Sequence, residues 1–114
     1  MKKVNNENFL DKIPVRKAGI EWSVDEDGKV TLQMENKGIA NRIAQKLLKK
    51  PKISYIHLDK TGSFVWPLID GKKTITDLGK EVDAHFGEEA HPLYERLATF
   101  FNILDSYKFI SWVE

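Results

Sequence analysis

Residues able to perform acid–base, nucleophilic or metal chemistry are few in this sequence and are not spaced for it. The histidines His57, His85 and His91 do not repeat at the H-x-x-x-H spacing that places two imidazoles on one helix face. No cysteine is present, which excludes a thiolate nucleophile, a disulfide scaffold and Cys-ligated zinc or iron–sulfur sites. The acid pair Glu88/Glu89 has polar neighbours, not the apolar surroundings that catalytic carboxyl pairs require. We therefore expect that the protein is not an enzyme and that it has no cofactor and no metal site.

Composition describes one small globular domain. Of 114 residues, 41% are hydrophobic and 31% are charged, and the net charge is +1, so no global field attracts nucleic acid. No stretch approaches the roughly 18 apolar residues of a membrane span, and the first residues show no secretory signal. We expect a cytoplasmic chain with a flexible arm over residues 1–12 and one domain over 13–114.

Two segments near the start of this domain have the pattern of a β-hairpin. Apolar and polar residues alternate over 20–24 and again over 30–34, as in strands with one buried face. Between them, Asp25-Glu26-Asp27-Gly28 supplies turn chemistry. The pattern predicts two antiparallel strands joined by this turn.

The next segment, about 39–50, is predicted to be an inserted amphipathic helix. Apolar residues recur at helical spacing on one side, and Pro51 ends the pattern. The other side carries the basic residues Arg42, Lys46, Lys49 and Lys50. A solvated helix face and a docking surface for an acidic leader peptide or an acidic partner enzyme both fit this cluster.

The second half of the chain predicts a strand, three helices and a β-rich tail. Residues 53–58 are β-rich, and Asp59 is placed to cap a short helix that Pro67 should kink or shorten. A capping-box pattern at Thr74–Asp77 opens a second helix that ends at Gly87, and a third helix spans about 90–106. Residues 109–113 can add a strand. The predicted order, β-β-α-β-α-α-α-β, indicates an α+β fold.

Residues 56–71, IHLDKTGSFVWPLIDG, resemble the centre of the PqqD family. That family's pattern is a strand ending in Leu-Asn or Leu-Asp, then Gly or Ala, an aliphatic-Trp pair and Asp-Gly. Thr74, Ile75 and Asp77 match its continuation, and Phe109-Ile110 matches the aromatic-aliphatic pair after its last helix. The resemblance covers about 13–111. Two departures, the helix at 39–50 and Pro67, set the chain apart from the branch devoted to pyrroloquinoline quinone synthesis.

The resemblance implies a small winged helix-turn-helix domain without catalytic activity. In that family the leader of a ribosomally synthesised precursor peptide lies between the third strand and the last helix. It adds a strand to the sheet and is presented to a modifying enzyme, often a radical SAM protein. Matching positions place this cleft between Ile53–Leu58 and about Leu93–Tyr107.

The sequence itself supports a groove at this place in two ways. The predicted strand has no proline, central charge or bulge signal to protect its edge. The last helix carries two apolar stripes, and the second, Tyr94, Ala98 and Phe101, either is buried or borders an open cleft. The helix at 39–50 can also cover the edge. The predicted peptide-binding residues are Ile53, Ser54, Tyr55, Ile56, His57, Leu58, Tyr94, Leu97, Ala98, Phe101 and Asp105.

An alternative function is a winged-helix transcriptional regulator that binds DNA. A recognition helix carries basic and amide side chains toward the DNA. Residues 74–108 instead contain seven acidic and three basic residues, a net charge of −4 that phosphates would repel. Peptide recognition is therefore favoured over nucleic acid. A homodimer, formed through the exposed strand edge or the C-terminal tail, is left open.

Overall fold

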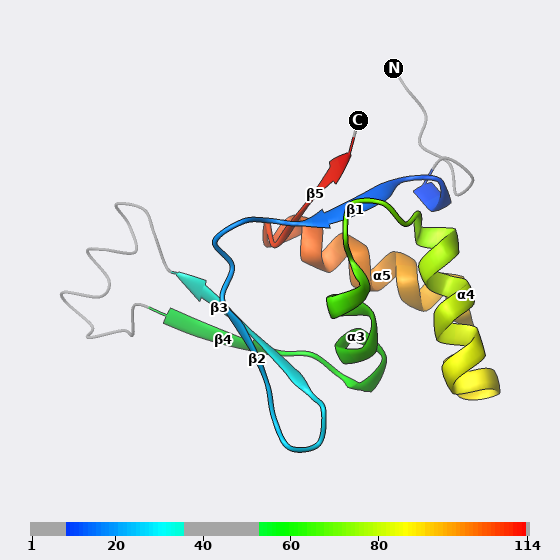
Figure 1. Cartoon of the computed structure of the whole chain (residues 1–114), viewed down its shortest axis with the longest axis horizontal. Coiled ribbons are helices and arrows are strands. Elements are labelled where there is room, and N and C mark those ends of the chain that lie inside the picture. Colours follow the sequence, from blue (N-terminus) through cyan, green and yellow to red (C-terminus); the bar gives the residue numbers. More distant parts are fainter. Residues whose placement is uncertain (1–8, 36–52, 114) are drawn as a thin grey trace.

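The structure, a computed structural model, describes residues 9–35 and 53–113. These residues form a small α+β unit with two antiparallel sheets and three α-helices (Figure 1). The strands are β1 (Ile13–Arg16), β2 (Trp22–Val24), β3 (Val30–Glu35), β4 (Ile53–His57) and β5 (Ile110–Val113). The helices are α3 (Lys60–Val65), α4 (Ile75–Phe86) and α5 (Leu93–Ser106), with short 3₁₀ helices at Trp66–Leu68 and Gly87–Ala90.

The three-stranded sheet has the order β2-β3-β4 and is antiparallel throughout. The predicted hairpin is confirmed: β2 and β3 flank a turn in which Gly28 has a φ of +82°. The Asp25 side chain accepts hydrogen bonds from the N–H groups of Asp27 and Lys29 at 2.8 and 2.9 Å. The predicted helix at 39–50, with Arg42, Lys46, Lys49 and Lys50, lies outside the described residues.

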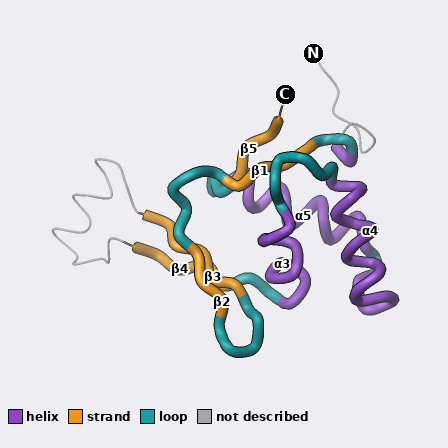
Figure 2. The backbone as a smooth tube through the Cα atoms, viewed as in Figure 1, coloured by secondary structure: helices purple, strands orange, loops and turns teal. Residues whose placement is uncertain are grey.

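A second sheet pairs β1 with β5, from opposite ends of the chain (Figure 2). The tail was predicted to add a strand, but its partner was not predicted: Ile13 lies opposite Val113 and Arg16 opposite Ile110. Residues 9–12, which we assigned to the flexible arm, also contact the domain. The Phe9 ring lies 5.9 Å from that of Trp112, and the Lys12 carbonyl accepts a hydrogen bond from the Ile75 N–H.

The boundaries of α3 and α4 confirm the predictions made from local sequence, whereas the last helix begins at Leu93 and not at about residue 90, because Gly87–Ala90 form a separate 3₁₀ helix. The Asp59 carboxylate accepts a hydrogen bond from the Gly62 N–H at 2.7 Å and caps α3. Helix α3 ends at Val65, and Pro67 lies in the 3₁₀ helix that follows. Thr74 and Asp77 form the capping box of α4.

The core gathers apolar side chains from all three helices and both sheets. Its largest fully buried members are Trp66, Phe101, Phe109, Leu32, Ile69, Ile75, Leu78, Leu97, Leu104 and Ile110. One polar side chain, Ser63, is buried among the described residues. Its hydroxyl accepts a hydrogen bond from the Val30 N–H at 2.8 Å and donates one to the Leu58 carbonyl at 3.3 Å. Ser63 therefore ties α3 to β3 and to the end of β4.

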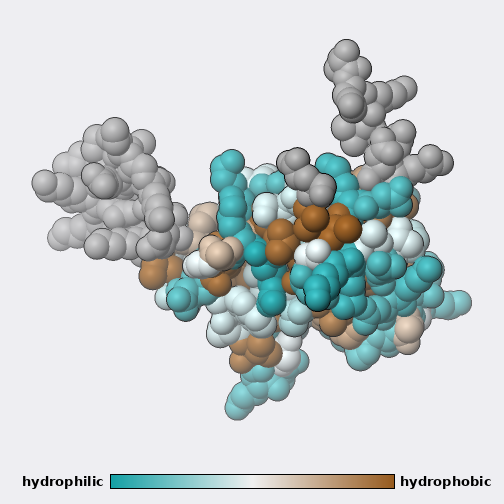
Figure 3. Space-filling view, turned by 45° about the horizontal axis from the view of Figure 1, so that its top comes forward, coloured by the Kyte–Doolittle hydropathy of each residue, from teal (hydrophilic) through white to brown (hydrophobic). Residues whose placement is uncertain are grey.

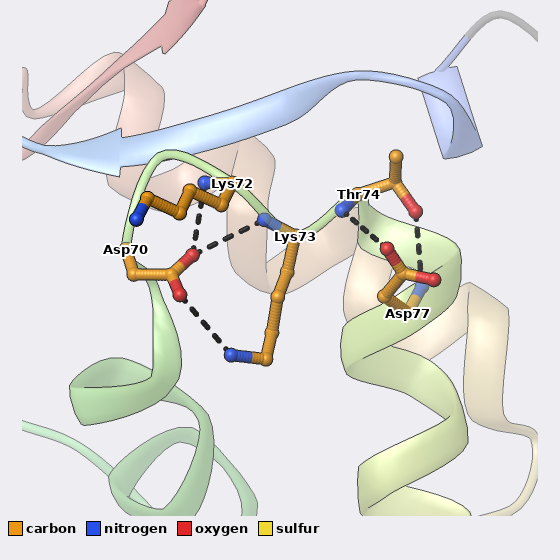
Figure 4. A network of polar contacts seen from close by, with 5 residues as sticks. All are labelled: Asp70, Lys72, Lys73, Thr74 and Asp77. Atoms are coloured by element: carbon orange, nitrogen blue, oxygen red, sulfur yellow. Dashed lines mark hydrogen bonds and ion pairs between the residues drawn. The ribbon is translucent and has the colours of Figure 1, made fainter.

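The Asp70-Gly71 pair, part of the resemblance above, organises the turn into α4 (Figure 4). The Asp70 carboxylate accepts hydrogen bonds from the backbone N–H groups of Lys72 and Lys73 and from the Lys73 ammonium, at 2.9 to 3.1 Å. These bonds, the one from Lys72 foremost, lower the pKa of Asp70 to about 2. Gly71, at a φ of +79°, donates its N–H to the Pro14 carbonyl. The motif thus joins β1 to α4.

Candidate peptide-binding groove

A cavity of about 790 Å³ lies between the end of β4, the start of α3 and one side of α5. Ile56, His57 and Leu58 line it from β4 and the residue that follows the strand. Leu97, Phe100, Ile103 and Leu104 line it from α5, and Phe109 lines it from the segment before β5. Its size is in the range of 300–1,000 Å³ that is usual for ligand pockets. Apolar side chains from two elements therefore face each other across an open space.

The backbone of β4 offers hydrogen-bonding groups beside this cavity. In an antiparallel strand the N–H and C=O of one residue point to the same side, and successive residues alternate. The Leu58 N–H donates to the Val30 carbonyl at 2.8 Å, and Ile56 is registered with Leu32, so the even-numbered residues pair with β3. The main-chain groups of Tyr55 and His57 consequently point away from β3. In the described part of the chain no strand lies on that side.

Five of the predicted binding residues line a cavity. Ile56, His57, Leu58 and Leu97 line the one just described, and Ile53 lines a neighbouring one. Ser54 and Tyr55 lie on β4 between them, and the Tyr55 side chain is 56% exposed. The predicted strand is thus an edge strand beside a cavity.

The second apolar stripe of α5 faces elsewhere, contrary to the open-cleft expectation. Tyr94, Ala98, Phe101 and Asp105 do not line the cavity. Tyr94 packs over Gly79 of α4, where an added Cβ would lie 2.8 Å from the tyrosine ring. Phe101 is fully buried, with its ring centroid 6.3 Å from that of Trp112. Tyr94 and Phe101 of this stripe therefore pack α5 against α4 and against the core.

On α5 the cavity is lined by Leu97, which was predicted, and by a side of the helix that the sequence analysis did not single out. Arg96, Thr99 and Ile103 lie on this side, and the Ile103 side chain is 47% exposed. A signal was present in the sequence, because the apolar Ile103 belongs neither to the second stripe nor to the first stripe, which consists of Leu93, Leu97, Phe100 and Leu104. Gly62 also borders the cavity, and a Cβ there would lie 2.8 Å from Phe100. The glycine of the family pattern therefore lets α3 approach α5.

Polar groups close one end of the cavity. The Lys60 ammonium lies 3.6 Å from the Glu89 carboxylate, and Arg96 donates a hydrogen bond to the Glu89 carbonyl at 2.9 Å. His57 is hydrogen-bonded through Nδ1 to the Thr31 hydroxyl at 2.9 Å. Over residues 9–35 and 53–113, no group of three or more His, Cys, Asp and Glu side chains is placed to hold a metal ion. The side chains that line the cavity can therefore contact a ligand and orient it.

Comparison with protein families matches residues 38–110 to the family described as Coenzyme PQQ synthesis protein D (PqqD). The match covers well over half of the 114 residues. The chain belongs to the PqqD family. The matched region contains β4, all three described helices and both walls of the cavity, whereas the hairpin of β2 and β3 lies before it. It also includes residues 39–50, which we treated as an insertion.

Comparisons with curated proteins and with solved structures found no match. None of the described helices is long and apolar enough to cross a membrane.

Proposed function

We propose that this PqqD-family chain captures the leader of a ribosomally synthesised precursor peptide and presents it to a modifying enzyme of the radical SAM type. The observation that carries the proposal is the edge of β4 away from β3, which has no partner strand among residues 9–35 and 53–113 and lies beside an apolar cavity. Strand addition requires this combination, because main-chain bonds supply affinity and side-chain pockets supply selectivity. We further infer that the hairpin and the three helices correspond to the winged helix-turn-helix arrangement of the family.

In this proposal the leader lies extended along β4. Its backbone pairs with the outward main-chain groups of Tyr55 and His57. Because side chains alternate along a strand, every second leader residue then points toward Ile56, Phe100 and Ile103, and the residues between face solvent. A leader with apolar residues at alternate positions suits the groove.

The edge of β4 is preferred to the other sheet edges in the described chain, among them that of β5. Figure 3 shows an apolar patch on one face of the described chain, and Val113 of β5 is 45% exposed. No residue of β5 lines the cavity between β4 and α5. We assign β4 to the leader because, among the described strands, it is the one that lines the cavity walled by α5.

We infer that the isolated chain performs no chemistry. The histidine that lines the described cavity, His57, is engaged by Thr31, and the apolar wall provides no paired acid and base. In this proposal the partner enzyme carries out the modification of the precursor peptide, and this chain needs no cofactor of its own.

The direct experiment is isothermal titration of the chain with the synthetic leader of a precursor encoded beside it. Wild type should bind one leader per chain. Ile103→Asp places a charge on the exposed part of the groove wall and should weaken binding more than tenfold, since a carboxylate would be desolvated on binding. Val24→Asp is the matched control, because Val24 is 53% exposed and lies in the hairpin outside the cavity. Equal affinities of the two variants and wild type would rule out the groove.

A further inference from the structure

A second cavity continues the groove along β4. It measures about 730 Å³ and is lined by Met34 and Ile53 from the sheet and by Tyr107 and Lys108 from the turn after α5. Both cavities are lined by Phe109. Ile53 begins β4, whereas Ile56 and Leu58 lie at its other end, so the two cavities follow one another along the strand. The start of β4 at Ile53 therefore lies beside the cavity lined by Tyr107 and Lys108, and its other end lies beside the first cavity.

The two ends of this groove differ in charge. At the His57 end, the first cavity is lined by Asp59 and Glu95, while its cations Lys60 and Arg96 are both engaged at Glu89. At the Ile53 end, the lining contains Lys17 and Lys108 with a single acid, Glu21.

Two exposed side chains at these ends are free to pair with a ligand. Within the described chain, neither the Glu95 carboxylate nor the Lys108 ammonium makes a hydrogen bond or an ion pair. One end of the groove thus favours a cation and the other an anion.

We propose that the groove selects a leader in which a basic residue precedes an acidic one by about four positions, an even spacing that keeps both side chains on the groove face; this rests on the proposed function. A peptide added antiparallel to β4, as β3 is on its other side, has its N-terminal part beside His57 and its C-terminal part beside Ile53. The basic residue then lies near Glu95 and the acidic one near Lys108. The spacing follows from the length of β4 at roughly 3.3 Å per residue.

The test uses a phage-displayed library of random dodecapeptides as the probe. Wild type should enrich peptides with Lys or Arg N-terminal to Asp or Glu. The double variant Glu95→Lys/Lys108→Glu, changed at two exposed positions, should enrich the opposite order. For one enriched peptide, exchanging its two charged residues should weaken binding to wild type about three- to tenfold at low salt. This difference should shrink at high ionic strength.

Two results would overturn these ideas separately. Enriched peptides with charges in no order, or in the reverse order, would overturn the charge inference and leave peptide capture intact. No enrichment by wild type over a variant with a blocked β4 edge, Tyr55→Pro, would overturn the proposed function and the charge inference with it.

Discussion

Replacing Tyr55 by proline should weaken leader binding while leaving the sheet assembled. Proline has no N–H, and it is tolerated where a strand's N–H points away from its neighbour. The register places the Tyr55 N–H on the free side of β4, so no bond to β3 is lost. Ile56→Pro would instead remove a bond between β4 and β3.

The magnitude follows from the single main-chain bond that is lost. A net hydrogen bond contributes about 0.5–1.5 kcal/mol, and a leader carbonyl left unpaired in the groove adds to the penalty. We expect a loss of about 1.5 kcal/mol, which is on the order of tenfold in Kd. Fluorescence anisotropy with a labelled leader measures this change, and urea unfolding checks that stability is retained.

Val24→Pro is the matched control for this experiment. By the register of β2 and β3, the Val24 N–H points outward on the opposite edge of the same sheet. This variant should bind the leader like wild type. If Tyr55→Pro binds unchanged, or if both prolines weaken binding equally, strand addition at β4 is the wrong mechanism.

Three further predictions concern stability and the choice of partner. Ser63→Ala should lower the free energy of unfolding in urea by about 1–3 kcal/mol, because the buried Val30 N–H loses its acceptor; an unchanged midpoint would contradict this. Asp70 has a lowered pKa, so its stabilising contribution should be present above pH 4 and lost as pH falls toward about 2. The stability difference between wild type and Asp70→Asn should therefore shrink over that window, and a constant difference would refute the assignment. Duplex DNA should show no salt-dependent mobility shift with this chain, and a shift would revive the regulator function.

Local chemistry made the element boundaries predictable. Asp59, Thr74 and Asp77 cap helices through contacts within three residues, and Pro67 acts on its own turn, so the sequence alone contains the necessary information. The hairpin was predictable for the same reason. The pairing of β1 with β5 was not, because it joins segments almost a chain length apart and depends on the packing of everything between them.

The wall of the groove formed by β4 was predictable from the sequence. The wall formed by α5 was predictable only in part. Periodicity shows which residues of α5 are apolar, yet it does not show which neighbour each side meets. The close approach at Gly79 turns Tyr94 toward α4, and Phe101 fills the core, which leaves Ile103 facing β4. Phe101→Asp should therefore unfold the domain by placing a charge in the core.

The most direct measurement is amide hydrogen exchange by NMR on the ¹⁵N-labelled chain, with and without the leader peptide. If the leader adds a strand to β4, the amides of Tyr55 and His57 should become protected on binding. Those of Trp22 and Val24, on the opposite edge, should not change. Protection confined to the hairpin or to β5, with Tyr55 and His57 still exchanging freely in the complex, would contradict the account.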